Sequence, residues 1–363
     1  MKIVYISNSI IPSRTANSIH VMKMCQAFAD NGHEVVLLVP NRYKEYQENI
    51  DDVYEYYGVR KNFKIKKLPY IYTRILRNFY YAYQTLKEIK IINPDLVYGR
   101  DLYGCFFSSY KYATIFEAHS PMNNSVSKQL LNLMDKNHLY KHTVVISDAL
   151  KNLILKSQNI KSYKIVVAHD GADKSSNLQK VLKQTTNLKV GYFGHLYKGR
   201  GIDIILEVAK NLKDIEFHIV GGNLDDINYW KSQIQSDNII FHGFVTPKLV
   251  PSYRNECDIL VAPYQKEVAV SGGKGNTSDF MSPLKIFEYM SSKKAIICSD
   301  LPVLREILNE DNSVLVKCDD ISDWRKAIEV LQDDSLRLQL ANRAYEDFIK
   351  KYTWKIRAKN VIK

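Results

Sequence analysis

Short apolar runs alternate with amphipathic stretches along most of the chain. Residues 2–7 and 35–39 have the apolar character of buried strands, and residues 19–30 between them have apolar positions at helical spacing. A strand, a helix and a strand in this order predict a βαβ unit and therefore a parallel sheet. Further strands are expected in the same half of the chain at 96–98, 113–116, 143–146 and 164–168.

The second half of the chain repeats this alternation after a polar segment. Its expected strands lie at 189–193, 216–220, 239–241, 258–262 and 295–298. Helices are expected at 202–211, at 335–351 and from Val303 onwards. Because 363 residues exceed one ordinary core, we expect two α/β domains, residues 1–174 and 188–345, joined by a linker at 175–187.

Polar residues follow the expected strands of the first domain. Arg100 comes shortly after the strand at 96–98, and His119 comes shortly after the strand at 113–116. In a doubly wound sheet the loops at the carboxyl ends of the strands form one ligand site, so these two residues are the strongest candidates here. His20 follows the loop after the first strand. A lone histidine is more often structural, but this position also suits substrate contact.

A helix that should bind an anion is expected near residue 283. Ser282 is a good N-cap, and Pro283 suits the first helical position. The free N–H groups and the helix dipole favour a phosphate there, and Lys285 adds a positive charge. Glu288 lies on the same face, one turn further, where a carboxylate suits a sugar diol. We predict a nucleoside diphosphate site; the alternative is a capped helix with an exposed Lys–Glu pair.

Two glycine-rich segments accompany this helix. Residues 194–201 follow the strand at 189–193, and their glycines allow the backbone to approach a phosphate while Lys198 and Arg200 supply charge. The segment matches neither a Walker loop nor Gly-x-Gly-x-x-Gly, so alone it is weak support. Residues 271–276 come just before the helix, and we expect them to close over a ligand.

The net charge of +12 is concentrated in the first half of the chain. Residues 1–184 contain 26 Lys and Arg against 15 Asp and Glu, whereas the remainder contains 25 against 24. A basic half predicts contact with an anionic surface, whether phospholipid, a lipid diphosphate or nucleic acid. A lysine-rich composition without any target is the alternative.

Residues 54–83 interleave tyrosine and phenylalanine with lysine and arginine. This mixture suits a membrane interface, where aromatic rings lie at headgroup depth and lysines meet anionic lipid. A packed helix pair with tyrosines in the core is a second interpretation. Base stacking on nucleic acid is a third, but no RNA or DNA module pattern occurs in the sequence, so we expect no nucleic-acid partner.

The cysteines and acidic residues argue against a metal site. The five cysteines are scattered and never form a Cys-x-x-Cys pair, which is typical of a reducing cytoplasm and not of structural zinc. Paired Cys/His spacings and an Asp-x-Asp motif are also missing from the sequence, so we expect no catalytic metal. The first residues lead directly into an apolar strand, and we expect no secretory signal.

Several of these motifs, in this order, resemble the retaining GT-B glycosyltransferases of family 4 (glycosyl transferases group 1), over nearly the whole chain. The motifs are ANSIH at 16–20, GRD at 99–101, FEAH at 116–119, VISD at 145–148, HDGAD at 169–173, the loop 194–201, SPLKIFEYM at 282–290 and the segment 352–358. The resemblance implies two Rossmann-like domains facing a cleft, with residues 346–363 as a helix that returns to the first domain.

The resemblance also implies an activity. Residues 188–345 would bind a nucleotide sugar, and the basic first domain would bind a glycan or polyprenyl-linked acceptor. The reaction would transfer a hexosyl group with retention of the anomeric configuration and would need no metal or other cofactor. It would belong to the biosynthesis of capsule, O-antigen or another cell-surface polysaccharide. The protein would be cytoplasmic and peripheral on the anionic inner face of the plasma membrane.

Roles carried over by position complete the implied site. The catalytic residues would be His119, Arg200, Lys285 and Asp279. The donor-binding residues would be Gly194, His195, Lys198, Gly222, Ser282, Leu284 and Glu288. The acceptor-binding residues would be Asn17, Ser18, His20 and Arg100.

Two departures from the family pattern are visible. The family has two glutamates eight residues apart, but Phe280 occupies the first position, so Asp279 is expected to substitute for it. The family commonly has arginine where this chain has His195, and Lys198 is expected to supply that charge. A nucleotide-sugar 2-epimerase of the same fold and a non-catalytic protein that binds a membrane surface or nucleic acid are the alternative functions.

Overall fold

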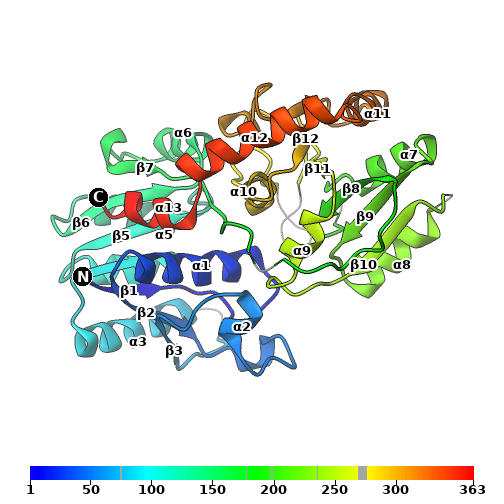
Figure 1. Ribbon diagram of the computed structural model, residues 1–363. Helices are drawn as coiled ribbons and strands as arrows, with labels where there is room; N and C mark the ends of the chain where they lie inside the picture. The colour runs from blue at the N-terminus through cyan, green and yellow to red at the C-terminus, as the bar shows by residue number, and fades with distance from the viewer. Residues whose placement is uncertain (74–75, 177, 198, 235, 269–275) are drawn as a thin grey trace. The chain divides into compact units, whose positions relative to one another are not determined.

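A computed structural model describes residues 1–73, 76–176, 178–197, 199–234, 236–268 and 276–363. The chain divides into two units (Figure 1). The first unit consists of Met1–Asp170 together with Trp354–Lys363, and the second unit consists of Gly171–Thr353. Each unit has its own sheet.

The first unit contains a sheet of seven parallel strands in the order β3-β2-β1-β4-β5-β6-β7. The strands are β1 Lys2–Ile6, β2 Glu34–Pro40, β3 Lys64–Leu68, β4 Leu96–Gly99, β5 Thr114–Ala118, β6 Tyr140–Val145 and β7 Ile165–Val167. The direction of winding reverses between β1 and β4. Open α/β sheets bind ligands at the carboxyl ends of the strands that flank such a reversal, so the residues after β1 and β4 are well placed for function. The predicted parallel sheet is confirmed.

The helices of the first unit are α1 Ala16–Asp30, η1 Tyr43–Glu45, α2 Val53–Tyr57, α3 Arg77–Ile92, α4 Leu102–Ser108, α5 Ser125–Asp135, α6 Asp148–Ser157, η2 Ser162–Lys164 and α13 Trp354–Val361. Short polar side chains cap α1, α2, α4, α5 and α6. The Thr15 side chain accepts a hydrogen bond from the N–H of Ser18, which is the usual N-cap geometry. For this reason α1 begins three residues earlier than the predicted helix at 19–30.

The end of the chain belongs to the first unit. Helix α12, Asp334–Lys351, lies in the second unit, and α13 follows it after a break at Tyr352 and Thr353. Figure 1 shows α13, drawn in red, alongside α1. The Asn31 side chain donates to the backbone oxygen of Lys355 at 2.9 Å, which ties the end of α1 to α13.

The second unit contains six parallel strands in the order β10-β9-β8-β11-β12-β13, with the reversal between β8 and β11. The strands are β8 Leu188–Phe193, β9 Ile215–Val220, β10 Ile239–Gly243, β11 Ile259–Ala262, β12 Ala295–Ser299 and β13 Val314–Val316. The helices are α7 Ile202–Asn211, α8 Leu224–Ser232, α9 Val250–Asn255, α10 Leu284–Ser291, η3 Leu304–Glu306, α11 Ile321–Val330 and α12. Both units are therefore doubly wound parallel-sheet domains, as predicted.

Several elements were not expected from the sequence, among them strands β3 and β13 and helices α2–α6, α8, α9 and α11, and one expected helix is shorter. Three of the five residues of β3 are lysines, Lys64, Lys66 and Lys67, which suit an edge strand but leave little apolar pattern. Strand β13 has three residues, and α11 follows it closely. The helix expected from Val303 is only the 3₁₀ turn η3, because the chain turns at Asn309, whose N–H donates to the side chain of Asn312 at 2.9 Å.

The aromatic and basic segment 54–83 divides between core and surface. Tyr56, Tyr57 and Tyr81 are buried, whereas Phe79 and Tyr83 are 51% and 63% exposed. The core interpretation therefore holds for some residues, and others remain available to a surface partner. Arg74 lies outside the described residues. None of the helices in the described part of the chain combines the length and apolarity that a membrane span requires.

Candidate active site

A buried carboxylate organises the polar centre of the first unit. Glu117 lies in β5, where its Oε1 accepts hydrogen bonds from Arg357 Nη2 and His119 Nε2, both at 2.7 Å. Its Oε2 accepts from the hydroxyl of Tyr98. Arg357 comes from α13, so the last helix of the chain supplies the charge that balances a strand residue in the sheet.

His20 and Asp170 extend this cluster. His20 Nε2 lies 3.0 Å from Glu117 Oε1, and its Nδ1 lies 2.9 Å from Asp170 Oδ1. These contacts are close enough for ion pairs but are not aligned as hydrogen bonds. Arg357 Nη2 is 3.8 Å from the same oxygen of Asp170. The carboxylates of Glu117 and Asp170 therefore face the guanidinium of Arg357 and the imidazole ring of His20.

Burial and charge act in opposite directions on Glu117. Burial acts to raise its pKa, but Arg357, His20 and His119 hold the pKa well below the usual range. Asp170 follows the same pattern: burial acts to raise its pKa, but His20, His119 and Arg357 together lower it. For His119, burial and the positive charge of Arg100 lower the pKa to about 3. The carboxylates are therefore ionised and His119 is neutral near pH 7.

The cluster of His20, Glu117, His119 and Asp170 has the residue types of a metal site, with ligand atoms within 4.8 Å of one another. Arg357 already balances one of its two carboxylates, however. A divalent cation would have to displace that guanidinium or lie beside it, and the second arrangement is electrostatically unfavourable. The donor set fits an internal ion-pair network better than a metal site.

Two residues predicted to bind the acceptor are buried. Ser18 Oγ donates to the backbone oxygens of Ser13 and Thr15 at 3.0 and 2.8 Å, so it closes the loop before α1. His20 is 1% exposed and contacts Glu117 and Asp170. Both side chains make internal contacts in this structure, Ser18 within the loop and His20 within the cluster, and their acceptor-binding role stays a prediction.

The other two predicted acceptor residues retain polar atoms without partners. Asn17 lies in the first turn of α1, and Arg100 follows β4, so both lie at the carboxyl ends of the strands that flank the reversal. Within the described residues, Asn17 Oδ1 and Arg100 Nη1 are buried without a hydrogen-bond partner. Buried polar atoms usually have partners, so these two atoms are suited to a ligand.

Lys285 is the corresponding feature of the second unit. It lies in the first turn of α10, only 9% exposed, with Nζ 3.8 Å from the ring centroid of Tyr192 and 5.1 Å from that of Tyr264. Burial and the nearby charge of Arg200 hold its pKa well below the usual range. Helix α10 begins at Leu284, one residue later than predicted, and Ser282 does not cap it because Pro283 is the N-cap residue.

Glycines make room for this lysine. A side chain at Gly194, whose φ is +149°, would place its Cβ 3.2 Å from Lys285 Nζ. A side chain at Gly221 would lie 2.2 Å from the backbone oxygen of Gly194, so the loops after β8 and β9 approach closely. Gly222 would in turn meet the side chain of Leu196. The predicted glycines therefore permit a close backbone arrangement around Lys285.

The remaining predicted donor residues of this unit lie near Lys285 or at the edge of the described chain. Arg200 lies over the ring of Tyr264 at 5.4 Å. His195 stacks on Tyr197, with ring centroids 4.8 Å apart. Lys198 and the 271–275 part of the predicted closing loop lie outside the described residues. Asp279 is exposed in a turn, where its carboxylate is 3.3 Å from Ser278 Oγ.

Glu288 has a partner that the sequence did not predict. Arg254, buried in α9, donates from Nη1 to Glu288 Oε2 at 3.1 Å and from Nε to Ser292 Oγ at 3.2 Å. In the described part of the chain, Glu288 Oε1 has no hydrogen-bond partner. One carboxylate oxygen is thus fixed while the other remains available.

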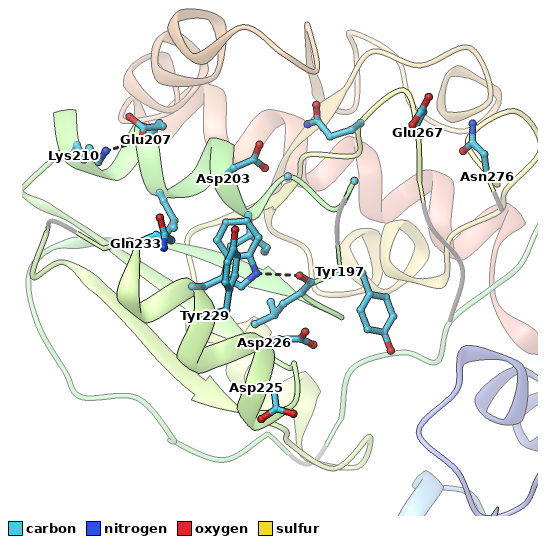
Figure 2. Close-up of a pocket in the computed structure, with 17 residues that line it drawn as sticks. Tyr197, Asp203, Glu207, Lys210, Asp225, Asp226, Tyr229, Gln233, Glu267 and Asn276 are labelled. Carbon is cyan, nitrogen blue, oxygen red and sulfur yellow. Dashed lines mark hydrogen bonds and ion pairs between the residues drawn. The ribbon is translucent and has the colours of Figure 1, made fainter. Parts of the chain in front are cut away.

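A groove of about 1330 Å³ lies between α7 and α8 (Figure 2). It is lined by the carboxylates Asp203, Glu207, Asp225, Asp226 and Glu267. Among its described lining residues Lys210 is the cation, and Tyr229 is one of the aromatic residues. The described residues predicted to bind the donor do not line it. Five carboxylates repel a diphosphate, so the start of α10 is the better phosphate site.

Four charged residues of these centres escaped prediction: Glu117, Asp170, Arg254 and Arg357. A signal existed for Glu117, because a charged residue within an apolar strand is unusual and needs a partner. Arg357 lies in the segment 352–358 that contributed to the family resemblance, but its partner is 240 residues away. Nothing in the spacing of α9 distinguishes Arg254 from a surface arginine.

The two sheets and their sites define a GT-B protein. The crystal structure of HepE from Anabaena in complex with UDP matches with a TM-score of 0.73 at 13% identity, covering 100% of this chain and 98% of HepE. A glycosyltransferase structure from Rickettsia africae gives a TM-score of 0.73 at 14% identity, covering 99% and 96%. At these identities the similarity establishes the fold.

Family models identify the chain more closely. Residues 18–176 match the model described as Glycosyltransferase Family 4, and residues 187–334 match the model described as Glycosyl transferases group 1. The chain therefore carries one glycosyltransferase domain of each kind, in that order, and the resemblance is confirmed at this level.

A curated relative is the O-antigen chain mannosyltransferase RfbU of Salmonella typhimurium. It is 27% identical over 197 residues, which are 53% of this chain and 51% of RfbU. The match thus spans about half the length of RfbU, and about a third of the other curated relatives.

Proposed function

We propose that the protein is a retaining, metal-independent glycosyltransferase. It transfers a hexosyl group from a nucleoside-diphosphate sugar to a glycan or polyprenyl-linked saccharide in the biosynthesis of capsule, O-antigen or another cell-surface polysaccharide. The observation that carries the proposal is the burial of the Lys285 side chain. Within the described residues, no carboxylate lies within ion-pair distance of its buried ammonium group. A buried cation without an internal anion is suited to binding an external one.

The second unit would hold the donor. Lys285, Arg200 and the N–H groups at Leu284 would stabilise the diphosphate, since the start of a helix favours an anion. Gly194, His195, Lys198, Gly222 and Ser282 would line the same site, with Asp279 near the sugar. Glu288 would accept the ribose hydroxyls with Oε1, while Arg254 holds its other oxygen.

Charge stabilisation would account for most of the rate enhancement. Bond cleavage places negative charge on the leaving diphosphate, and fixed positive groups lower the energy of that state. We expect the leaving phosphate to accept the proton of the attacking hydroxyl on the same face of the sugar. This arrangement retains the anomeric configuration and needs neither a protein base nor a metal.

The first unit would hold the acceptor. Asn17 Oδ1 and Arg100 Nη1 are an acceptor and a donor at the ligand-binding edge of the sheet, and together they suit the hydroxyl groups of a glycan. RfbU acts, by its name, in O-antigen synthesis, which supports a glycan acceptor here. A 2-epimerase needs no acceptor site, and the transferase is therefore the better hypothesis.

A thermal-shift screen tests the donor site. UDP, GDP, ADP and CMP, with their common sugars, are added to the full chain with and without EDTA. We expect one nucleoside diphosphate to raise the melting temperature by several degrees regardless of EDTA, because a ligand that binds only the folded state stabilises it. The HepE structures with UDP and with UDP-glucose make uridine the first choice. A shift that EDTA abolishes contradicts metal independence, and no shift with any nucleotide contradicts the proposal.

We also propose a peripheral cytoplasmic location at an anionic membrane. The exposed rings of Phe79 and Tyr83 in α3, together with the excess positive charge of the first half, support this proposal. Sedimentation with anionic vesicles should show binding that weakens with salt. Equal binding to neutral vesicles would contradict the electrostatic part, and the double substitution Phe79→Ser and Tyr83→Ser should weaken binding to anionic ones.

A further inference from the structure

The protonation of His119 follows from its contact with Glu117. The ring nitrogen Nε2 lies 2.7 Å from Glu117 Oε1, and an ionised carboxylate can only accept hydrogen bonds. The low pKa of Glu117, caused by its cationic neighbours despite burial, keeps this carboxylate ionised. His119 Nε2 must therefore carry a proton when it makes this contact.

The other ring nitrogen is left with a lone pair. Because burial and Arg100 lower the pKa of His119 to about 3, the ring holds one proton near pH 7, and that proton is on Nε2. The side chain is 19% exposed, and within the described residues Nδ1 has no hydrogen-bond partner. Nδ1 is thus an acceptor that a ligand can reach.

Neighbouring rings and charges fix the orientation of His119. The ring of His20 packs against it edge to face, with centroids 4.7 Å apart, and Trp354 packs in the same way on His20 at 5.2 Å. Arg357 holds Glu117 through Nη2 and also donates to the backbone oxygens of His169 at 2.9 Å and Ala168 at 3.1 Å. The carboxylate that orients His119 is therefore itself held by α13.

We infer that Glu117, held by Arg357, is a positioning residue that keeps His119 in the Nε2–H tautomer, so that Nδ1 accepts a hydrogen bond from a substrate hydroxyl group. This inference rests on the proposed function and makes the role of His119 more specific. His119 then acts as a hydrogen-bond acceptor and not as a general acid or base, because efficient proton transfer needs a pKa near the working pH.

Nitrogen-15 NMR of the full chain labelled on histidine tests the tautomer without any turnover. The His119 signals are assigned by their loss in His119→Gln. We expect a pyrrole-type Nε2 and a pyridine-type Nδ1 at pH 7. A protonated Nδ1, whether in the other neutral tautomer or in an imidazolium ion, overturns the inference.

Two substitutions on the same carboxylate separate positioning from general structure. In Glu117→Gln the side-chain amide can donate as well as accept a hydrogen bond. We therefore expect that the Nε2–H tautomer is no longer the dominant form of His119. Tyr98→Phe removes the partner of Oε2 and leaves the contact between Oε1 and His119 in place, so the wild-type tautomer should persist. Wild-type His119 spectra in Glu117→Gln overturn the positioning role. If Glu117→Gln does not fold, Glu117→Asp is the second variant: its shorter side chain withdraws the carboxylate from Nε2 of His119, so the same loss of the Nε2–H tautomer is expected.

Kinetics then connect the tautomer to function. In Glu117→Gln we expect kcat to fall at least tenfold while the thermal shift caused by the nucleoside diphosphate is unchanged. Unchanged kcat with an altered tautomer overturns the role of Nδ1 in the reaction. A missing nucleotide shift in the wild-type protein, by contrast, contradicts the proposed function while the NMR result still decides the tautomer.

Discussion

The two units treat buried charge in opposite ways. In the first unit, Glu117 is surrounded by Arg357, His119 and Tyr98, so its charge is satisfied inside the protein. In the second unit, Lys285 rests on tyrosine rings, and the described residues offer it no carboxylate. A satisfied charge holds structure together, whereas an unsatisfied one is costly to the fold and useful to a ligand. The contrast separates the Glu117 cluster, whose charges are paired internally, from Lys285, whose charge is not paired in the described part of the chain.

Breaking the ion-pair network around Glu117 should have the largest effect on stability. Arg357→Ala leaves the buried Glu117 carboxylate without its main counter-charge, and we expect a loss of about 3 to 5 kcal/mol in the unfolding of the first unit. Urea denaturation followed by tryptophan fluorescence measures it. The control is Arg60→Ala, which removes an exposed ion pair with Asp30 in the same unit and should cost at most about 1 kcal/mol. Equal losses of unfolding free energy in the two variants would contradict the special importance of the buried Arg357–Glu117 pair.

Removing the positive charge of Lys285 should lower the rate of turnover without lowering the stability of the protein. In Lys285→Met we expect turnover to fall roughly 10²- to 10³-fold, the scale of one lost transition-state contact. The melting temperature should stay the same or rise, because the desolvation cost of the buried ammonium disappears. Lys210→Met is the control, since Lys210 lies on α7 and pairs with Glu207. Full turnover in Lys285→Met, or a much lower melting temperature, would contradict the assignment.

The role of Glu288 can be separated from that of the phosphate site. Glu288→Ala should weaken nucleoside diphosphate binding roughly 10- to 100-fold, the range for hydrogen bonds to a charged group. Inorganic pyrophosphate has no ribose, so its affinity for the variant should equal that for the wild type. Isothermal titration with both ligands measures the difference. Equal weakening of both would place Glu288 at the phosphates instead.

Acid should weaken the first unit gradually. The pKa of His119 is about 3 in the folded protein, against an ordinary value of 6.5, so between these values the folded state binds fewer protons than the unfolded chain. The associated stability is present above about pH 6.5 and is lost as the pH falls towards 3. The lowered pKa values of Glu117 and Asp170 act in the same direction at lower pH. Urea midpoints at pH 7.5 and pH 5 should differ less in His119→Gln than in the wild type.

Most of the fold could be predicted because its signals are local. Buried parallel strands are continuous apolar runs, and amphipathic helices repeat at 3.6 residues, so most strands and the helices α7 and α12 lie close to their expected places. Strand β3 was missed because three of its five residues are lysines and only Ile65 and Leu68 are apolar. The helix expected at 335–351 ends where α12 ends, and the resemblance implied that the end of the chain returns to the first unit. The returning helix begins at Trp354 and not at residue 346, because the residue at which the chain leaves the second unit depends on packing.

The candidate site also has a part that local sequence signals predicted and a part that they did not. The start of α10 could be predicted, since Pro283, Lys285 and Glu288 lie within six residues of one another and a helix brings them to one end. The contact between Glu117 and Arg357 could not, because it joins residues 240 positions apart. Arg254 and Glu288 are 34 positions apart, on helices α9 and α10.

The sequence by itself determined which segments are strands, which helix should receive an anion, and that the first half is basic, because periodicity, capping and charge are properties of neighbouring residues. Only the tertiary structure decided which charges are satisfied. A buried charge is stable only with a partner at hydrogen-bond distance, and folding alone brings that partner to Glu117 while offering Lys285 none among the described residues.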